Sequence, residues 1–175
     1  MNYFELFGLE SQFTLDLANL STIYQTLQKK VHPDRFAHAS SQDQMLAVKK
    51  STLINDAYQT LKNPLKRAQY LLELRGVNMP SEQTSFGDVG FLMRQMELRE
   101  MLDDVKQADD VDAAVFDVAQ VFDTEFQQLF NQVQVQLADN TSESNKLACD
   151  NVRKLKFYQK LNVELEKLEE QLLDD

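Results

Sequence analysis

The sequence predicts an all-α protein, and three observations indicate this class. The chain has 175 residues with only four glycines and three prolines, the residues least suited to the interior of a helix. Its apolar residues recur every three or four positions, which is the period of an amphipathic helix. Patterns typical of strands are weak, and turn residues gather at a few short breaks. The length allows one ordinary domain or two small ones.

The first half of a predicted helical hairpin lies near the N-terminus. A short helix is expected to end at Gly8, because glycine commonly follows a helix. Asp16 can cap the next helix. That helix must stop near His32, because a residue before proline disfavours the α region. Its apolar face is predicted to comprise Leu17, Leu20, Tyr24, Leu27 and Val31.

The second half of the hairpin follows a loop over residues 32–40. The run from Ser41 to Gln44 predicts a capping box, in which Gln44 reaches back to the cap. The long helix after it ends at Asn63, and Pro64 can begin another short helix. The apolar stripe of the long helix is expected to comprise Leu46, Leu53, Ile54, Ala57, Tyr58 and Leu61.

A junction rich in turn residues is expected at residues 76–86, between one domain at residues 1–75 and a second at residues 87–175. Three longer helices are predicted beyond it: residues 86–106, residues 111–137, and a third from the break at residues 139–142 to the C-terminus. Short connections between long helices favour antiparallel neighbours, so this part is expected to be an antiparallel three-helix bundle.

The last two of these helices each carry an apolar face at helical spacing. In the middle helix the face comprises Val111, Val115, Val118, Phe122, Phe126, Leu129 and Val133. In the last helix it comprises Leu147, Leu161, Leu165, Leu168 and Leu172.

The charge is divided unevenly between the two parts. The formal net charge of −10 comprises +2 over residues 1–75 and −12 over residues 76–175. A segment this acidic is unsuited to nucleic acid, since phosphate binding depends on clustered cations. The near-neutral first part can still present a local basic face to an acidic partner.

Other sequence features bear on the compartment. No apolar run approaches the ~18 residues of a membrane span, and the N-terminus lacks the pattern of a secretory signal. The single cysteine, Cys149, can form neither an internal disulfide nor a zinc site. We therefore expect no membrane association, no cofactor and a cytoplasmic location.

The tripeptide His32-Pro33-Asp34 is the sharpest local feature. As an isolated string it favours an ordinary turn, in which proline fixes φ and the aspartate bonds nearby backbone. Here it lies between two amphipathic helices, next to the cations Lys29, Lys30 and Arg35. A rigid turn that presents an imidazole and a carboxylate can bind a partner at low entropic cost. The pattern predicts a docking loop for an acidic patch on another protein.

The first 75 residues resemble the J-domain family. The matching segments are Tyr3-Phe4 with Leu6 and Gly8-Leu9, Tyr24, His32 to Phe36, Ile54 to Tyr58 with Leu61, and Lys66-Arg67-Ala68 with Tyr70. Their order and spacing agree throughout. The resemblance implies that the tripeptide and the helix before it meet the ATPase domain of a DnaK-type chaperone.

The helix from residue 86 differs from an ordinary core helix in having two apolar stripes. One comprises Phe91, Leu98, Leu102 and Val105, and the other comprises Val89, Leu92, Met93 and Met96. The second stripe is flanked by acidic residues, and methionine-containing apolar surfaces suit protein recognition. Alternatively, the first domain packs on one stripe and the bundle on the other. Periodicity does not separate these two interpretations.

Both parts together resemble the HscB family of co-chaperones. The further matches are Phe91-Leu92-Met93 with Met96 to Glu100, Val152 to Phe157, and Leu168-Glu169-Glu170 with Leu172-Leu173. The resemblance implies an L-shaped protein whose bundle binds an IscU-type iron–sulfur scaffold. The residues it implies for that contact are Leu92, Met93, Met96, Glu97, Glu100, Asp104 and Phe157. At residue 104, Asp stands where Glu is usual, and the shorter acid weakens the expected contact.

The function that the resemblance implies is that of a non-enzyme. The bundle holds the scaffold while the tripeptide engages HscA, the specialised DnaK-like chaperone, and stimulates its ATPase activity. The start of the chain at the J-domain, with no preceding cysteine motif, indicates a bacterial type. A general DnaJ-like co-chaperone for unfolded polypeptides is the alternative, although the glycine/phenylalanine-rich and zinc-binding segments of such proteins are missing. A metal site at His32, Asp34 and His38 lacks helix-anchored ligand spacing.

Overall fold

A computed structural model describes residues 1–173 of the chain, and these residues contain helices and no strand. The all-α prediction is confirmed. The contacts divide the chain into a first unit, Met1–Gly76, and a second unit that begins at Val77. The second domain was expected to extend to residue 175. Residues 174 and 175 lie outside the described part of the chain.

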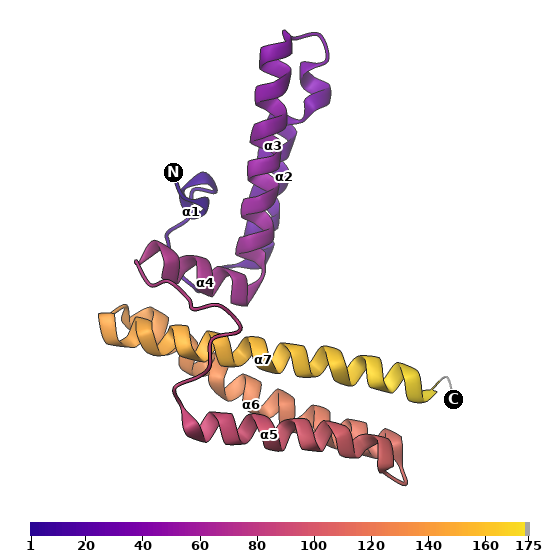
Figure 1. The fold of residues 1–175 in the computed structure, drawn as a ribbon. Coiled ribbons are helices and arrows are strands. Elements are labelled where there is room, and N and C mark those ends of the chain that lie inside the picture. Colours follow the sequence, from indigo (N-terminus) through magenta and orange to yellow (C-terminus); the bar gives the residue numbers. More distant parts are fainter. Residues whose placement is uncertain (174–175) are drawn as a thin grey trace. The chain divides into compact units, whose positions relative to one another are not determined.

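The first unit is a helical hairpin with short flanking helices (Figure 1). Its elements are α1 (Tyr3–Leu6), α2 (Leu17–Val31), the 3₁₀ turn η1 (Pro33–Phe36), α3 (Ser41–Lys62) and α4 (Pro64–Leu74). The Asp16 carboxylate accepts hydrogen bonds from the N–H groups of Ala18 and Asn19, as an N-cap does. Asn63 caps α4 in the same way, with Pro64 at its first position. The expected hairpin is therefore present, with α2 and α3 side by side.

The start of α3 differs from the predicted capping box. Ser40 is the N-cap: its backbone is extended, and its Oγ accepts the Asp43 N–H at 3.1 Å. Gln44 does not reach back to the cap. Its Nε2 instead donates to the carbonyls of Phe36 and Ala37, each at 3.1 Å. The side chain predicted to close the cap therefore ties α3 to the preceding loop.

Four predicted core leucines are exposed to about one half: Leu17, Leu46, Leu53 and Leu147. In α3 the buried residues are Ala47, Ile54, Ala57 and Leu61. Leu46 and Leu53 each precede one of these by one residue and so lie about 100° around the helix from the core. The position of Leu147 is explained likewise, because Ala148 and Cys149 take the buried places beside it.

The buried side chain of Arg67 joins several segments of the first unit. Its side chain is 6% exposed, and its Nε and Nη1 donate to the carbonyls of Phe13 and Leu61, both at 2.7 Å. The guanidinium also lies over the Phe13 ring, 4.7 Å from its centroid. One cation thereby fixes the loop before α2 and the end of α3 onto α4.

Replacing Arg67 by Met should destabilise the chain by about 3 kcal/mol, because buried hydrogen bonds to a charged donor are lost while the carbonyls remain buried. Urea unfolding followed by circular dichroism measures this, with Lys66→Met, on the exposed side of the same turn, as the matched control. A loss for Arg67→Met no larger than that for the control would contradict this role.

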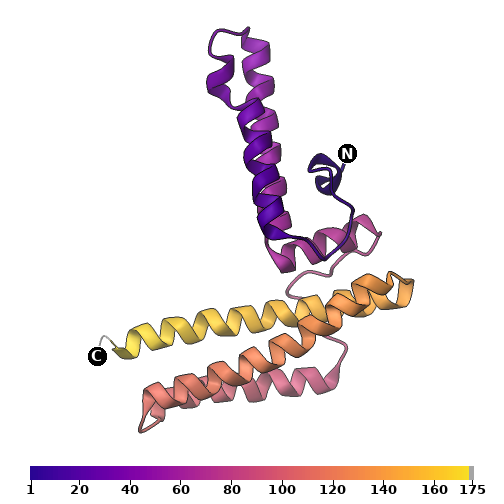
Figure 2. The ribbon, with the colours of Figure 1, turned by 180° about the vertical axis from the view of Figure 1, so that it is seen from behind.

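The second unit is a three-helix bundle (Figures 1 and 2). It comprises α5 (Val89–Asp104), the short η2 (Val105–Gln107), α6 (Val111–Asp139) and α7 (Ser142–Leu173). α5 begins at Val89 rather than at residue 86 because Asp88 caps it, accepting the Phe91 N–H at 3.2 Å. α6 ends at Asn140, whose left-handed backbone (φ 51°) turns the chain into α7.

All three helices of the bundle contribute to one core. Its most buried members are Leu98 from α5, Phe122 from α6 and Leu161 from α7, each fully buried. The predicted face of α6 is confirmed: Val115, Phe122 and Val133 are buried, and the other members of that face are partly buried against the core.

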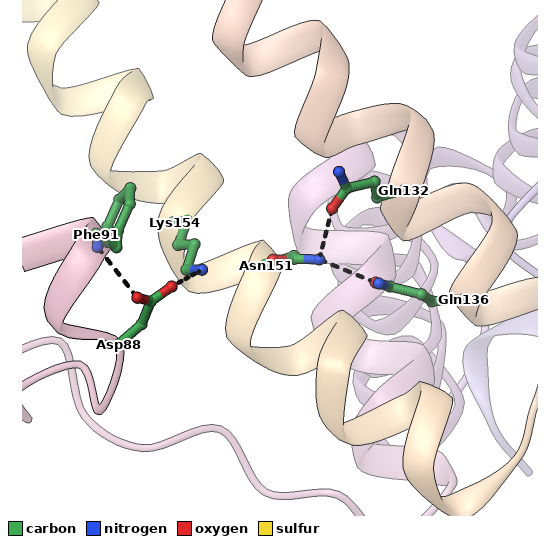
Figure 3. A network of polar contacts seen from close by, with 6 residues as sticks. All are labelled: Asp88, Phe91, Gln132, Gln136, Asn151 and Lys154. Atoms are coloured by element: carbon green, nitrogen blue, oxygen red, sulfur yellow. Dashed lines mark hydrogen bonds and ion pairs between the residues drawn. The ribbon is translucent and has the colours of Figure 1, made fainter. Parts of the chain in front are cut away.

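Polar contacts across the bundle show the direction of its helices. Asn151 of α7 donates to Gln132 and Gln136 of α6 at 3.4 and 3.1 Å (Figure 3), while Asn145 meets Asn140 at 3.0 Å. Residue numbers along α7 rise from Asn145 to Asn151 while those of their partners fall from Asn140 to Gln136 and Gln132. This is the pattern of antiparallel neighbours. The predicted antiparallel packing is confirmed for α6 and α7.

Candidate functional site

The tripeptide lies at the turn between α2 and η1. His32 ends α2 and caps η1, where its Nδ1 accepts the Asp34 N–H at 3.2 Å. The same nitrogen lies 3.5 Å from Oδ2 of the Asp34 carboxylate, so both ends of Asp34 face the imidazole. The His32 and Asp34 side chains are 56% and 93% exposed. The turn therefore presents one imidazole and one carboxylate to solvent from a fixed backbone.

The three cations predicted beside the tripeptide are all exposed. Lys29 and Lys30 lie in the last turn of α2, where positive charge is favoured by the helix dipole. Arg35 lies in the last turn of η1. Within the first unit, Lys29 and His32 also line one open groove of about 600 Å³.

Sequence reasoning missed this groove, which runs between α2 and α3. Its other lining residues are Tyr24, Gln25, Gln28, Ser51, Thr52 and Asn55. Gln28 and Ser51 join its walls through two hydrogen bonds of 3.0 and 2.8 Å. Tyr24 stacks on Tyr58 at 4.1 Å. The groove depends on the register of α2 against α3, which local spacing does not reveal.

The two stripes of α5 have separate environments. The first is the core stripe, in which Phe91, Leu98, Leu102 and Val105 are all buried. In the second, Val89, Met93 and Met96 are 67%, 60% and 73% exposed, and Leu92 is half-buried. An apolar stripe with methionines open to solvent is typical of a surface that binds another protein.

Phe157 of α7 is half-buried beside the start of α5. Its ring meets the Phe91 ring edge-on, with centroids 5.8 Å apart. The Arg99 guanidinium lies over it at 5.5 Å and pairs with Glu164 at 3.2 Å. Leu92 and Arg99 are seven residues apart and share one side of α5. Phe157 thus borders the exposed stripe on its α7 side.

The acidic candidates on α5 differ in their partners. Glu97, Glu100 and Asp104 are all exposed. Glu97 pairs with Arg94 at 2.7 Å, whereas Glu100 and Asp104 show no ion pair among residues 1–173. The surface therefore offers two carboxylates to water and one that is already held.

Contacts before α5 fix it onto α7 (Figure 3). The Asp88 carboxylate caps α5 and also pairs with Lys154 at 3.0 Å. These two interactions, that with Lys154 first, lower the pKa of the Asp88 carboxyl below its ordinary range. Arg153 donates to the Thr84 carbonyl, and its guanidinium lies over the Phe86 ring at 4.4 Å. The start of the exposed stripe is thereby held in place.

Tyr158 lies in the core behind this surface and is 2% exposed. Its burial, and next the charge of Glu125, raise the pKa of its hydroxyl to about 12, against an ordinary value of about 10. The folded state disfavours the phenolate, so the stabilisation from Tyr158 is complete below about pH 10 and is lost as the pH rises towards about 12.

The Tyr158→Phe variant should therefore lose less stability than the unsubstituted chain as the pH rises from about 10 to about 12. Urea unfolding at about pH 8 and at about pH 11.5 measures the difference. Equal losses in the two proteins would contradict the raised pKa.

Residues 1–173 contain no group of three His, Cys, Asp or Glu side chains that could hold a metal ion. Cys149 is buried, as expected of a small apolar residue, and burial raises the pKa of its thiol. No described helix is both long and apolar enough to cross a membrane.

Comparisons with known proteins match both units. Residues 2–70 match the DnaJ domain, and residues 87–166 match the family described as the HSCB C-terminal oligomerisation domain. A co-chaperone protein HscB homolog from Colwellia psychrerythraea is 61% identical over 175 residues, the full length of both chains. One from Vibrio cholerae is 49% identical over 174 residues, covering 99% of each.

Two solved structures are similar to the whole chain. The chaperone HscB from Vibrio cholerae has a TM-score of 0.91 at 49% identity, covering 98% of this chain and 99% of its own. Human co-chaperone protein HscB has a TM-score of 0.87 at 29% identity, covering 97% of this chain and 82% of its own.

Proposed function

Because the chain belongs to the HscB family of co-chaperones, we propose that it delivers an IscU-type iron–sulfur scaffold to an HscA-type, DnaK-like chaperone and stimulates that chaperone's ATPase activity. One observation carries the proposal: each unit exposes its own candidate binding surface. The first unit presents His32 and Asp34, and the second presents Met93 and Met96.

The first surface engages the chaperone. The His32 imidazole and the Asp34 carboxylate are accessible on a backbone that their own hydrogen bond holds, so little freedom is lost on binding. The adjacent Lys29, Lys30 and Arg35 favour an acidic partner and speed its association. ATP hydrolysis is the chaperone's own chemistry. The co-chaperone contributes by binding one chaperone conformation more tightly than another.

The second surface engages the scaffold. Met93 and Met96 supply adaptable apolar contacts, with Leu92 and Phe157 at the edge. Glu97, Glu100 and Asp104 surround this centre with negative charge. Apolar anchors with a polar rim are the usual anatomy of a protein interface. The partner that fits is a protein with an apolar patch bordered by cations.

One chain that holds both partners raises the local concentration of scaffold at the chaperone. Hydrolysis then locks the chaperone on the scaffold and favours release of the cluster to acceptor proteins. We propose that this process takes place in the cytoplasm, because the single cysteine is free and that compartment keeps thiols reduced.

Titration calorimetry with an IscU-type scaffold tests the proposal, with an unfolded polypeptide as the comparison ligand. Selective binding of the scaffold near 1 μM, about −8 kcal/mol, is expected. Capture of the unfolded polypeptide with no binding of the scaffold would instead indicate a general DnaJ-like role.

A further inference from the structure

Arg94 of α5 connects the proposed scaffold surface to the neighbouring helix. Its Nη1 donates to Glu97 Oε2 at 2.7 Å, and its Nε donates to Glu125 Oε1 of α6 at 2.7 Å. Two different nitrogens of one planar group make these bonds, so the angle between them is fixed. The Arg94 side chain therefore sets the position of one carboxylate relative to the other.

The two ends of this bridge differ in exposure. The Glu125 side chain is 24% exposed, and its second oxygen, Oε2, is buried. The Glu97 side chain is 56% exposed. Glu125 is therefore largely enclosed by the bundle, whereas Glu97 reaches solvent.

The charge on Arg94 is secure under all ordinary conditions. The hydrogen bond to Glu125, and next that to Glu97, raise the pKa of the guanidinium further above its ordinary value. Proton loss therefore does not release Glu97.

Glu97 lies at the edge of the exposed methionine stripe, one residue after Met96 and four after Met93. Its Oε2 is occupied by Arg94, and its Oε1 makes no hydrogen bond among the described residues. The carboxylate thus keeps Oε1 as an acceptor for a donor on a bound protein, while the hydrogen bond from Arg94 to Oε2 holds its rotamer. A side chain ordered before binding loses less conformational freedom when the complex forms.

We propose that Arg94 is a positioning residue for scaffold binding: anchored on Glu125, it holds Glu97 so that Oε1 meets a donor group of the scaffold. This inference rests on the proposed function. It assigns a binding role to a residue that lies outside the exposed stripe and has its other contact on α6.

The rival explanation is a brace that only joins α5 to α6. A brace affects binding whether or not Glu97 is present. A positioning residue affects binding only through Glu97. The two roles therefore differ in a double-mutant cycle, which isolates the coupling between two side chains.

The cycle comprises Arg94→Gln, Glu97→Gln and the double variant, each titrated with an IscU-type scaffold by calorimetry and melted by circular dichroism. We expect Arg94→Gln to weaken binding between roughly threefold and tenfold, the range for one ordered side chain. Against a Glu97→Gln background, the same change should weaken binding less than twofold, as a rough limit.

Arg94→Lys provides a second test of the same role if Arg94→Gln unfolds. Lysine retains the charge but not the fixed fork, so it should bind with intermediate affinity, and this deficit should also vanish in the Glu97→Gln background. Lys160→Gln is the matched control, because Lys160 pairs with Glu82 at 2.8 Å elsewhere in the bundle. Its affinity should equal that of the unsubstituted chain.

The outcomes separate the two claims. Absence of binding by the unsubstituted chain overturns the proposed function and this inference with it. Scaffold binding that Arg94→Gln leaves unchanged or strengthens overturns the inference alone. An equal loss from Arg94→Gln with and without Glu97 does the same, because it identifies a brace.

Discussion

Replacing His32 by Gln is expected to abolish stimulation of the chaperone's ATPase while leaving the fold and scaffold binding intact. His32 is exposed and supplies the only imidazole of the tripeptide. A central interface residue contributes about 2 kcal/mol or more, so the concentration needed for stimulation should rise at least roughly thirtyfold, and stimulation should be lost at the concentration that gives the unsubstituted chain half its full effect. A steady-state ATPase assay over a range of co-chaperone concentrations measures the effect.

His38→Gln is the matched control for this variant. His38 is the other histidine of the chain and is also exposed, six residues further along the same connection between α2 and α3. The control should stimulate as the unsubstituted chain does. Full stimulation by His32→Gln, or equal loss in both variants, would show that the tripeptide is not the docking element.

Replacing Leu92, Met93 and Met96 together by Ala should weaken scaffold binding by about 3 kcal/mol, roughly a hundredfold. Met93 and Met96 are 60% and 73% exposed, so their truncation removes little of the bundle core. Leu92 is half-buried and accounts for most of the modest loss of stability that we expect. Calorimetry gives the affinity, and circular dichroism gives the helicity.

A double variant of α6 provides the comparison for this experiment. Phe116 and Val135 are 63% and 62% exposed, and both lie outside the proposed surface. Replacing them by Ala removes exposed apolar area without altering α5, so scaffold binding should be unchanged. A triple α5 variant that is unfolded at room temperature, or one that binds the scaffold normally, would contradict the proposal that these three residues form the scaffold-binding surface.

Helix ends were the part of the fold that could be predicted best from sequence. Asp16 and Pro64 act within a few residues of themselves, so their effect follows from local chemistry. The start of α3 was missed by one residue because Ser40 and Ser41 have equal capping chemistry. Only the extended backbone of Ser40 decides between them.

Exposure could be predicted only in part. Helical spacing identified both stripes of α5, yet the same spacing placed Leu46 and Leu53 in the core. A periodic pattern gives the relative angle of side chains but not how far around the helix its neighbours reach. In the first half of α3 the neighbours cover the side that carries Ala47, and the adjacent leucine remains outside.

The bridge from Arg94 to Glu125 could not be predicted from the sequence. Its residues lie 31 positions apart. Their meeting depends on the axial register of α5 against α6, which no local spacing encodes. The Glu97 partner, three residues from Arg94, was within reach of helical spacing. From the sequence, Glu97 was expected only as a contact for the scaffold.

The most direct test of the central claim asks whether both surfaces must lie on one chain. The measurement is the scaffold-dependent increase in chaperone ATPase activity at low protein concentration. It compares the unsubstituted chain with an equimolar mixture of His32→Gln and the triple α5 variant, which supplies both surfaces on separate chains. We predict that the mixture fails to reproduce the increase, because the effective concentration gained by linkage is lost. An increase equal to that of the unsubstituted chain would contradict delivery of the scaffold to the chaperone by a single molecule.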